Sequence, residues 1–187
     1  LYDLVLLLLR RLRTAWPDAT MVISQLPERE QVPALLTRKV DLVLGRITEP
    51  LPPDVVVHPL REERLIAILP TFHRLASGPS VDLRSLAGEN FAMFPRRLEP
   101  VVFDNYIQAC MRAGFTLRIE HEVSDAQTQA LAIAAGLGVG LSGDHLALRF
   151  PELVYLPVEP AVGIANIAAL WFESCLPRCL EPFLQDL

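Results

Sequence analysis

One stretch of the sequence contains residue types that could form a catalytic or phosphate-binding site. Residues 136–143 read Gly-Leu-Gly-Val-Gly-Leu-Ser-Gly, and Asp144 and His145 follow directly. A dinucleotide-binding loop needs its glycines after a strand and before a helix, whereas these glycines follow a helical pattern and lead into a strand. A nucleophile elbow needs one residue between its serine and each flanking glycine, and Ser142 is directly followed by Gly143. Neighbours in one turn, such as Ser142, Asp144 and His145, cannot generally aim at one another, so an enzyme is not predicted.

The cysteines and histidines do not form a metal-binding or disulfide pattern. Cys175 and Cys179 are four residues apart, but Pro177 lies between them and no histidine is near, so two free thiols are expected. The third cysteine, Cys110, stands alone, and the histidines are widely spaced. An odd number of cysteines without a disulfide framework fits a reducing cytoplasm. We therefore expect no metal, no cofactor and a cytoplasmic protein.

Composition and charge set further limits on function. With 187 residues, 51% of them hydrophobic, the chain can bury a core of ordinary size. Its formal net charge of -5 lacks the basic excess that phosphate neutralisation requires, so we expect no DNA binding by this chain itself. The longest apolar run, residues 4–9, is far shorter than the roughly 20 residues that span a bilayer, and its arginines follow it, unlike those of a secretory signal. Because the chain opens with Leu1, we expect it to be part of a longer protein without a membrane segment here.

Helical and strand patterns alternate along the chain. Apolar periodicity and flanking breakers predict helices over 2–16, 28–38, 101–113, 126–135 and 176–187, a helical turn over 82–87, and strands over 20–24, 40–44, 55–60, 64–69, 91–94, 117–123, 139–141, 154–156 and 167–172. Pro33 weakens the second helix, because a proline beyond the first turn removes a backbone hydrogen bond. The run Val-Asp-Leu-Val-Leu at 40–44 is typical of a parallel strand buried on both faces. The alternation predicts an α/β fold with mostly parallel sheets.

Short motifs in a set order show what this alternation resembles. They are Trp16-Pro17-Asp18, residues 40–45, Leu60 with Glu62 or Glu63 before a strand that ends in Pro70, His73-Arg74-Leu75-Ala76, Ala113-Gly114-Phe115, and Glu122-Val123 followed by residues 131–140. Over essentially the whole chain, this order resembles the effector-binding domain of LysR-type transcriptional regulators. Three further features look most like the branch that responds to benzoate, muconate and chlorocatechol-derived acids: Gly45-Arg46, residues 60–65 and Phe94-Pro95.

Three positions depart from the pattern of that family. Arg74 stands where the family usually has proline, and Gly143 stands where its strand usually closes with proline. Glu28 replaces the small hydroxyl residue that muconate-responsive members place at the start of the second helix. A carboxylate at this position would repel a second carboxylate of a ligand unless it pairs with an arginine. The departure therefore argues against a dicarboxylate effector.

The resemblance implies an α/β fold of two Rossmann-like lobes joined by two crossover strands, similar to type 2 periplasmic binding proteins. The first lobe would be discontinuous, with residues 1–68 and 144–187, and the second would contain residues 69–143. The chain would leave and return where apolar strands end at Pro70 and Gly143. A winged helix-turn-helix domain upstream of this chain would bind promoter DNA, and a further strand of the first lobe is expected before residue 1.

The implied ligand site lies between the lobes. Ligands of open α/β sheets bind beyond the carboxyl ends of strands, so the residues after the strands that end near 23, 44, 94 and 123 are candidates. The candidate effector-binding residues are Ser24, Gln25, Leu26, Pro27, Arg46, Pro95, Arg96, Arg97, Val102, Ser124 and Asp125. Guanidinium groups and a hydroxyl can donate to both oxygens of a carboxylate, so we expect a small organic acid, aromatic or related. The structural alternatives are an ion pair for Arg46 with Glu63, solvated loop charges for Arg96 and Arg97, local hydrogen bonds for Ser24 and Gln25, and a helix cap for Asp125.

Apolar residues on several sides of helices 2–16 and 101–113 predict a surface that contacts a second copy of the chain. The alternative is that these residues belong only to the core of the domain itself. In the resembled family these two helices pair between antiparallel effector domains, which implies a homodimer or homotetramer. The resemblance thus implies an effector-sensing and oligomerisation domain of a bacterial transcription regulator, not an enzyme. A solute-binding protein of a transporter has the same lobes and is the alternative. An enzyme on this fold would need a nucleophile or base that the expected cleft lacks.

Overall fold

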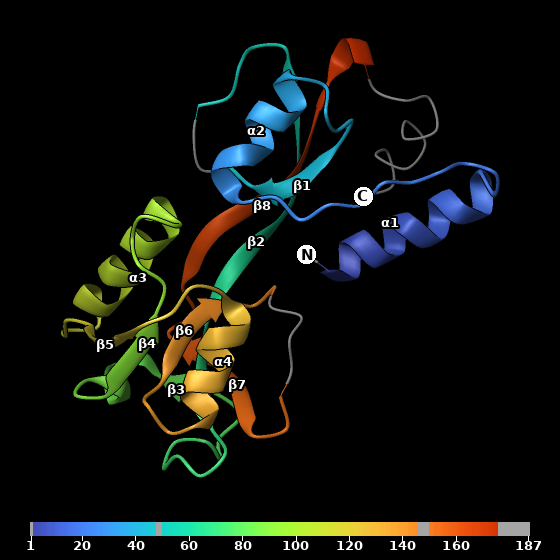
Figure 1. Ribbon diagram of the computed structural model, residues 1–187. Helices are drawn as coiled ribbons and strands as arrows, with labels where there is room; N and C mark the ends of the chain where they lie inside the picture. Colours follow the sequence, from blue (N-terminus) through green and yellow to red (C-terminus); the bar gives the residue numbers. More distant parts are fainter. Residues whose placement is uncertain (1, 48–49, 146–149, 176–187) are drawn as a thin grey trace. The chain divides into compact units, whose positions relative to one another are not determined.

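The computed structural model describes residues 2–47, 50–145 and 150–175 (Figure 1). The elements are α1 (Tyr2–Ala15), α2 (Glu28–Leu36), β1 (Val43–Arg46), β2 (Val55–Pro70), β3 (Val81–Asp82), the 3₁₀ turn η1 (Leu83–Leu86), β4 (Asn90–Met93), α3 (Pro100–Arg112), β5 (Arg118–Glu122), α4 (Ala126–Ala134), β6 (Gly140–Gly143), β7 (Leu153–Glu159), β8 (Gly163–Phe172) and the 3₁₀ turn η2 (Glu173–Cys175). The expected helix over 176–187 lies outside the described residues. Helices and strands alternate, as an α/β fold requires.

The chain divides into two compact units at positions that differ from those expected. Unit 1 contains the chain up to Glu62 and from Ala165 on, and unit 2 contains Glu63–Ile164. The return to unit 1 therefore comes at Ala165 and not at residue 144. The reason is that β7 is antiparallel to the second half of β2, from Ile66 opposite Pro157 to Pro70 opposite Leu153, and so stays in unit 2.

In unit 1, helices cover both faces of a small sheet in which β8 lies between β1 and β2. Val43 of β1 packs in a cluster with Leu35 of α2. The opposite face of the sheet carries Trp171 of β8, which packs in a second cluster with Leu8 of α1. Successive side chains of a strand point to opposite faces, so the continuously apolar strands place α2 and α1 on opposite sides. Figure 1 shows α2 lying along β1.

Two predictions for unit 1 are wrong. Residues 20–24 do not form a strand, and Val22 is 88% exposed, because the described part of the chain offers this segment no neighbouring strand. β1 pairs with β8 in antiparallel orientation, from Val43 opposite Leu170 to Arg46 opposite Ile167, although its apolar run suggested a parallel strand. Burial on both faces makes a strand apolar whatever its orientation, so composition did not distinguish the two cases.

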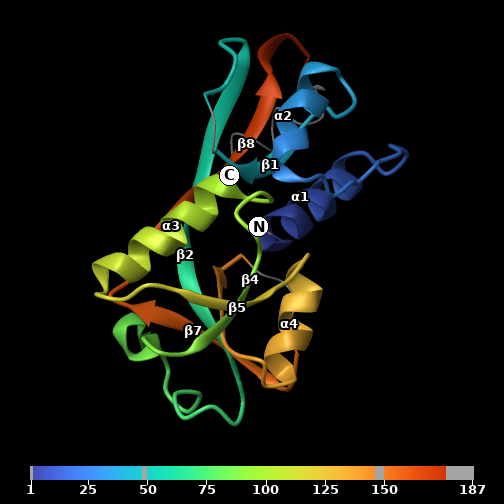
Figure 2. The ribbon, with the colours of Figure 1, turned by 60° about the vertical axis from the view of Figure 1, so that its left-hand side comes forward.

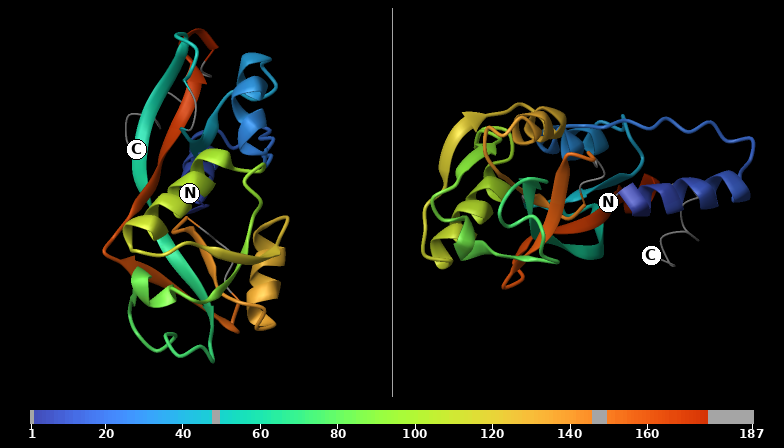
Figure 3. Two further views of the ribbon diagram at one scale, coloured as in Figure 1. Left: turned by 90° about the vertical axis from the view of Figure 1, so that its left-hand side faces the viewer. Right: turned by 90° about the horizontal axis from the view of Figure 1, so that it is seen from below.

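Unit 2 contains a mixed sheet built around the second half of β2. β6 and β7 are both antiparallel to β2, β3 is parallel to β7, and β4 is parallel to β5 and bridges Val139, next to β6, through Phe91. The expectation of mostly parallel sheets is therefore wrong. The two strands predicted at 55–60 and 64–69 are one strand of 16 residues, which Figure 3 shows as a single continuous ribbon.

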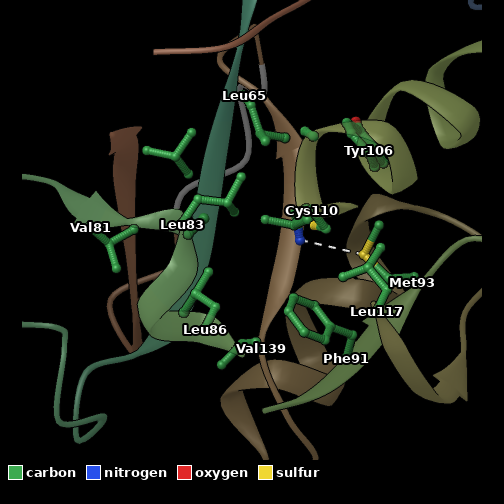
Figure 4. Packing of buried hydrophobic residues seen from close by; sticks show 14 of the residues in the cluster. Leu65, Val81, Leu83, Leu86, Phe91, Met93, Tyr106, Cys110, Leu117 and Val139 are labelled. Atoms are coloured by element: carbon green, nitrogen blue, oxygen red, sulfur yellow. Dashed lines mark hydrogen bonds between the residues drawn. The ribbon is translucent and has the colours of Figure 1, made fainter. Parts of the chain in front are cut away.

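The core of unit 2 lies on both faces of this sheet. Leu65, Ala67 and Leu69 of β2 pack with residues of α3, whereas Ile68 packs with Ile133 of α4. Figure 2 shows α3 and α4 with β4 and β5 between them. Figure 4 shows part of the α3 cluster, in which the Leu141 N–H donates to Met93 Sδ. Burial in the same cluster raises the pKa of Cys110 to about 12, so this thiol is neutral at physiological pH.

Gln129 of α4 is a polar side chain in this apolar interior, with only 1% of its surface exposed. Its Nε2 donates to the carbonyl oxygens of Ala92, at 2.9 Å, and Leu141, at 3.4 Å. The side chain thereby links α4 to the strand β4 and to β6. Buried carbonyls that lose their donor remain desolvated and cost free energy.

We expect Gln129→Leu to lower the free energy of unfolding by about 1–3 kcal/mol, because two buried carbonyls lose a donor. The measurement is urea denaturation followed by circular dichroism. Gln127→Leu is the control, because Gln127 lies on the exposed side of the same helix. Equal midpoints for the two variants would show that the buried amide does not stabilise the unit.

Candidate functional site

The first group of candidate residues precedes α2 in unit 1. Ser24 and Gln25 are exposed, and Pro27 is the N-cap of the helix without a side-chain cap. The carbonyl of Leu26 accepts a hydrogen bond of 3.2 Å from Nε2 of Gln31, one turn into α2. This bond holds the loop against the helix.

Arg46 ends β1 and lies against the first turn of α2. Its NH1 is 3.9 Å from Glu28 Oε2, and only 12% and 15% of the two side chains are exposed. Gly45 permits this approach, because a side chain there would overlap the amide of Gln31. The strand end and the helix start thus place a buried guanidinium next to a buried carboxylate.

The second group of candidates lies in unit 2 at the ends of β4 and β5. Pro95, Arg96 and Arg97 follow β4, and Ser124 and Asp125 follow β5. The two strands are parallel, with Met93 opposite Glu122, and the Val123 N–H donates to Met93 O at 3.1 Å. Their carboxyl ends therefore meet at one edge, which brings the two predicted segments together.

Both arginines of this edge are paired with carboxylates of the same unit. Arg96 donates to Asp104 through Nε at 2.7 Å and NH2 at 2.6 Å, and Arg97 donates to Glu122 at 2.7 Å. The hydrogen bonds from Arg96 hold the pKa of Asp104 below its usual value. All four side chains are largely exposed, so these pairs add little stability, and a ligand anion would have to compete with them.

Ser124 and Asp125 form the cap of α4. Asp125 accepts from the Thr128 N–H at 2.8 Å, and Thr128 Oγ1 accepts from the Asp125 N–H at 3.1 Å, which completes a capping box. Ser124 Oγ donates to the same carboxylate at 2.8 Å. These bonds, with the one from the Thr128 backbone strongest, lower the pKa of Asp125. The helix-cap alternative for Asp125 therefore describes its contacts.

Val102, another candidate, is fully buried in the core of unit 2. A cavity of about 10 Å³, enough for about one water molecule and far below the roughly 300–1,000 Å³ usual for ligand pockets, lies nearby. It is lined by Met93, Phe94, Pro95, Glu99, Phe103 and Tyr106. Only Pro95 was among the candidates. Phe103 and Tyr106 are three residues apart on one face of α3, and Glu99, the N-cap of that helix, is four residues before Phe103, so this periodicity was a usable signal.

Glu63 and His145 form a contact that the sequence did not indicate, because 82 positions separate them. Glu63 is fully buried, and its Oε1 pairs with Nδ1 of His145 within unit 2. A side chain at position 143 would overlap the Glu63 carboxylate, which explains why Gly143 can stand where the family pattern has proline. The pairing of Glu63 with Arg46 of unit 1 stays a prediction.

The residues that first suggested catalysis have other partners. His145 pairs with Glu63, and Asp144 Oδ1 accepts from the Arg64 N–H at 3.3 Å. Within the described ranges no group of three His, Cys, Asp or Glu side chains could hold a metal ion. Cys179 and the side chain of Cys175 lie outside those ranges. None of the helices in the described part is long and apolar enough to cross a membrane.

The sequence matches the family model of the LysR substrate binding domain over residues 2–187. It is 31% identical over 143 residues to the HTH-type transcriptional regulator CatR of Pseudomonas putida, which is 75% of this chain and 48% of that protein. It is also 33% identical to the HTH-type transcriptional regulator TfdS of Cupriavidus pinatubonensis. This alignment, 193 positions long, covers 98% of this chain and 62% of that protein. The chain spans about half the length of the first curated relatives that it matches.

The fold is also similar to a solved structure, the BenM effector binding domain with its effector benzoate. The TM-score is 0.82 at 21% sequence identity, and the alignment covers 98% of this chain and 85% of that one. This likeness confirms the predicted α/β fold, of the kind found in type 2 periplasmic binding proteins.

We expect Asp125→Ala to lower the melting temperature at neutral pH, because α4 loses its cap. A carboxylate whose pKa is lowered by folding stabilises the protein above its unfolded-state pKa, and that contribution is lost as the pH falls through the folded-state value. The difference between the parent and the variant should therefore shrink in acid. Thermal melts from neutral to acidic pH measure it. Asp125→Asn keeps an acceptor without a charge, and a pH-independent difference between parent and Asp125→Ala would contradict the assignment.

Proposed function

Because this chain belongs to the LysR substrate-binding domain family, we propose that it is the effector-sensing and oligomerisation domain of a bacterial transcriptional regulator. The match over residues 2–187 is the observation that carries this proposal. Promoter DNA would be bound by a domain outside this chain, in agreement with its net charge of -5. The regulator would act in the cytoplasm, where its DNA is.

The proposed effector is a small organic acid, aromatic or related. Arg46 in unit 1 and Arg96 in unit 2 supply guanidinium groups at strand ends, where ligands of α/β folds bind. The relative BenM is described with benzoate as its effector, which supports the same class of ligand. A ligand would favour one arrangement of the lobes over another only as far as its affinities for the two arrangements differ.

The curated relatives distinguish this proposal from its alternatives. CatR and TfdS are both HTH-type transcriptional regulators, which favours a regulator over a solute-binding protein of a transporter. They are not enzymes, and His145 and Asp144 of this chain are engaged in structural contacts.

Two helices present apolar side chains to solvent and suit a second copy of the chain. Leu6 and Leu7 of α1 are 48% and 41% exposed, and Val101 and Met111 of α3 are also exposed. Exposed apolar side chains gathered on one helix are typical of interaction surfaces. We propose that α1 and α3 pair between copies in a twofold dimer, or in a tetramer built from such dimers.

A thermal-shift screen of aromatic and aliphatic carboxylates tests the effector class. We expect at least one acid to raise the melting temperature, and Arg46→Ala and Arg96→Ala to reduce that shift. Arg118→Ala is the control, because Arg118 is exposed on β5 and pairs with Glu120 of the same strand. If no acid stabilises the protein, or if both test variants respond like the parent, the proposed binding residues are wrong.

Analytical ultracentrifugation at micromolar concentration tests the assembly. We expect a dimer or larger species, and a shift to monomer in Leu7→Glu or Met111→Glu, because a charge would be desolvated in the interface. Leu131→Glu on α4 introduces the same charge at another exposed leucine and should leave the assembly intact. A monomeric parent would contradict the proposed pairing.

A further inference from the structure

Arg46 lies beside a carboxylate that belongs to its own unit. The distance of 3.9 Å between its NH1 and Glu28 Oε2 is longer than a hydrogen bond, so the pair attracts mainly through charge. Both side chains are more than four-fifths buried, and solvent screens such a pair weakly. The arrangement is held in place by the Gln31 bond to Leu26 O and by the close approach of α2 to Gly45.

This pairing changes what an acid meets at Arg46. A ligand carboxylate that comes within hydrogen-bond distance of the guanidinium also approaches Glu28, because the two side chains are in contact. Part of the attraction from Arg46 is then cancelled by repulsion from Glu28. A second carboxylate on the ligand would add further repulsion, whereas a hydrogen-bond donor would be attracted to Glu28.

The two side chains have opposite hydrogen-bonding chemistry. A guanidinium only donates, and an ionised carboxylate only accepts. A ligand that hydrogen-bonds to both must therefore present an acceptor and a donor near each other. An unsubstituted monocarboxylate can hydrogen-bond only to Arg46, but a carboxylate with a neighbouring hydroxyl or ammonium group can hydrogen-bond to both.

We propose that Glu28 is a specificity-determining residue of the effector site. It selects acids that carry a hydroxyl or ammonium group near their carboxylate, and it disfavours dicarboxylates. This inference rests on the proposed function as a sensor of organic acids and names the class of acid. The observation that carries it is the buried contact between Glu28 and Arg46.

Three benzene carboxylates that differ at one ring position provide the test: benzoate, 3-hydroxybenzoate and isophthalate. Isothermal titration of the full chain should give the order 3-hydroxybenzoate, benzoate, isophthalate from tightest to weakest. Glu28→Gln should tighten isophthalate binding at least about tenfold, because a like charge is removed at short range. It should also reduce the advantage of 3-hydroxybenzoate over benzoate. Glu28→Thr, also neutral, provides a second variant if Glu28→Gln does not fold.

Glu30→Gln is the matched control. Glu30 lies in the same first turn of α2 and also pairs with an arginine, Arg29 at 3.8 Å, but its side chain is 52% exposed. Glu30→Gln makes the same change of net charge as Glu28→Gln and should leave the order of affinities for the three acids unchanged. If the acids bind and the ratios of their affinities are the same in the parent and both Glu28 variants, the role of Glu28 is overturned and the proposed function stands. If none of the acids binds the parent or any variant, the organic-acid function is itself overturned.

Discussion

Burial of β2 on both of its faces is the constraint on which the rest of the structure depends. Residues 65–69 of this strand are at most 5% exposed; Leu65, Ala67 and Leu69 lie in a cluster with α3, and Ile68 lies in a cluster with α4. Each large apolar side chain buried in this way contributes about 1.5–3 kcal/mol to stability. Such a strand must have neighbours on both edges and a helix on both faces, which β6, β7, α3 and α4 supply. The ends of the neighbouring strands, where the candidate residues lie, follow from that arrangement.

Charge pairing is the second property that organises the candidate site. Each of the three arginines expected to bind an acid has a carboxylate neighbour: Glu28 for Arg46, Asp104 for Arg96 and Glu122 for Arg97. An arginine that is already paired attracts anions in general less strongly than an isolated one, and a ligand must replace or share the existing partner. A net charge of -5 acts in the same direction. Selection among acids then depends on the other groups that a ligand carries.

The positions at which this chain departs from the family pattern have partners that account for them. Arg74 donates to Ser85 O and to Glu89 Oε1, both at 2.8 Å, so the residue that replaces proline links its turn to the segment around η1. Gly143 leaves space for the buried carboxylate of Glu63. Glu28 contacts Arg46. Arg74 and Glu28 thus make local contacts through their side chains, and Gly143 leaves room for a neighbouring side chain because it has none.

The sequence by itself determined the family, the α/β class and most elements, because apolar periodicity, breakers and motif order are local properties. It also placed the residues after β4 and after β5 among the candidates, and it recognised Asp125 as a possible cap from its position before an apolar helix. Only the tertiary structure decided strand orientation, the return to unit 1 at Ala165, the burial of Val102 and the pairing of Glu63 with His145. These features depend on which distant segments meet, and a strand buried on both faces has the same composition whichever way its neighbours run. For the same reason, residues 20–24 carry the pattern of a strand and yet form none, since a strand exists only beside a partner.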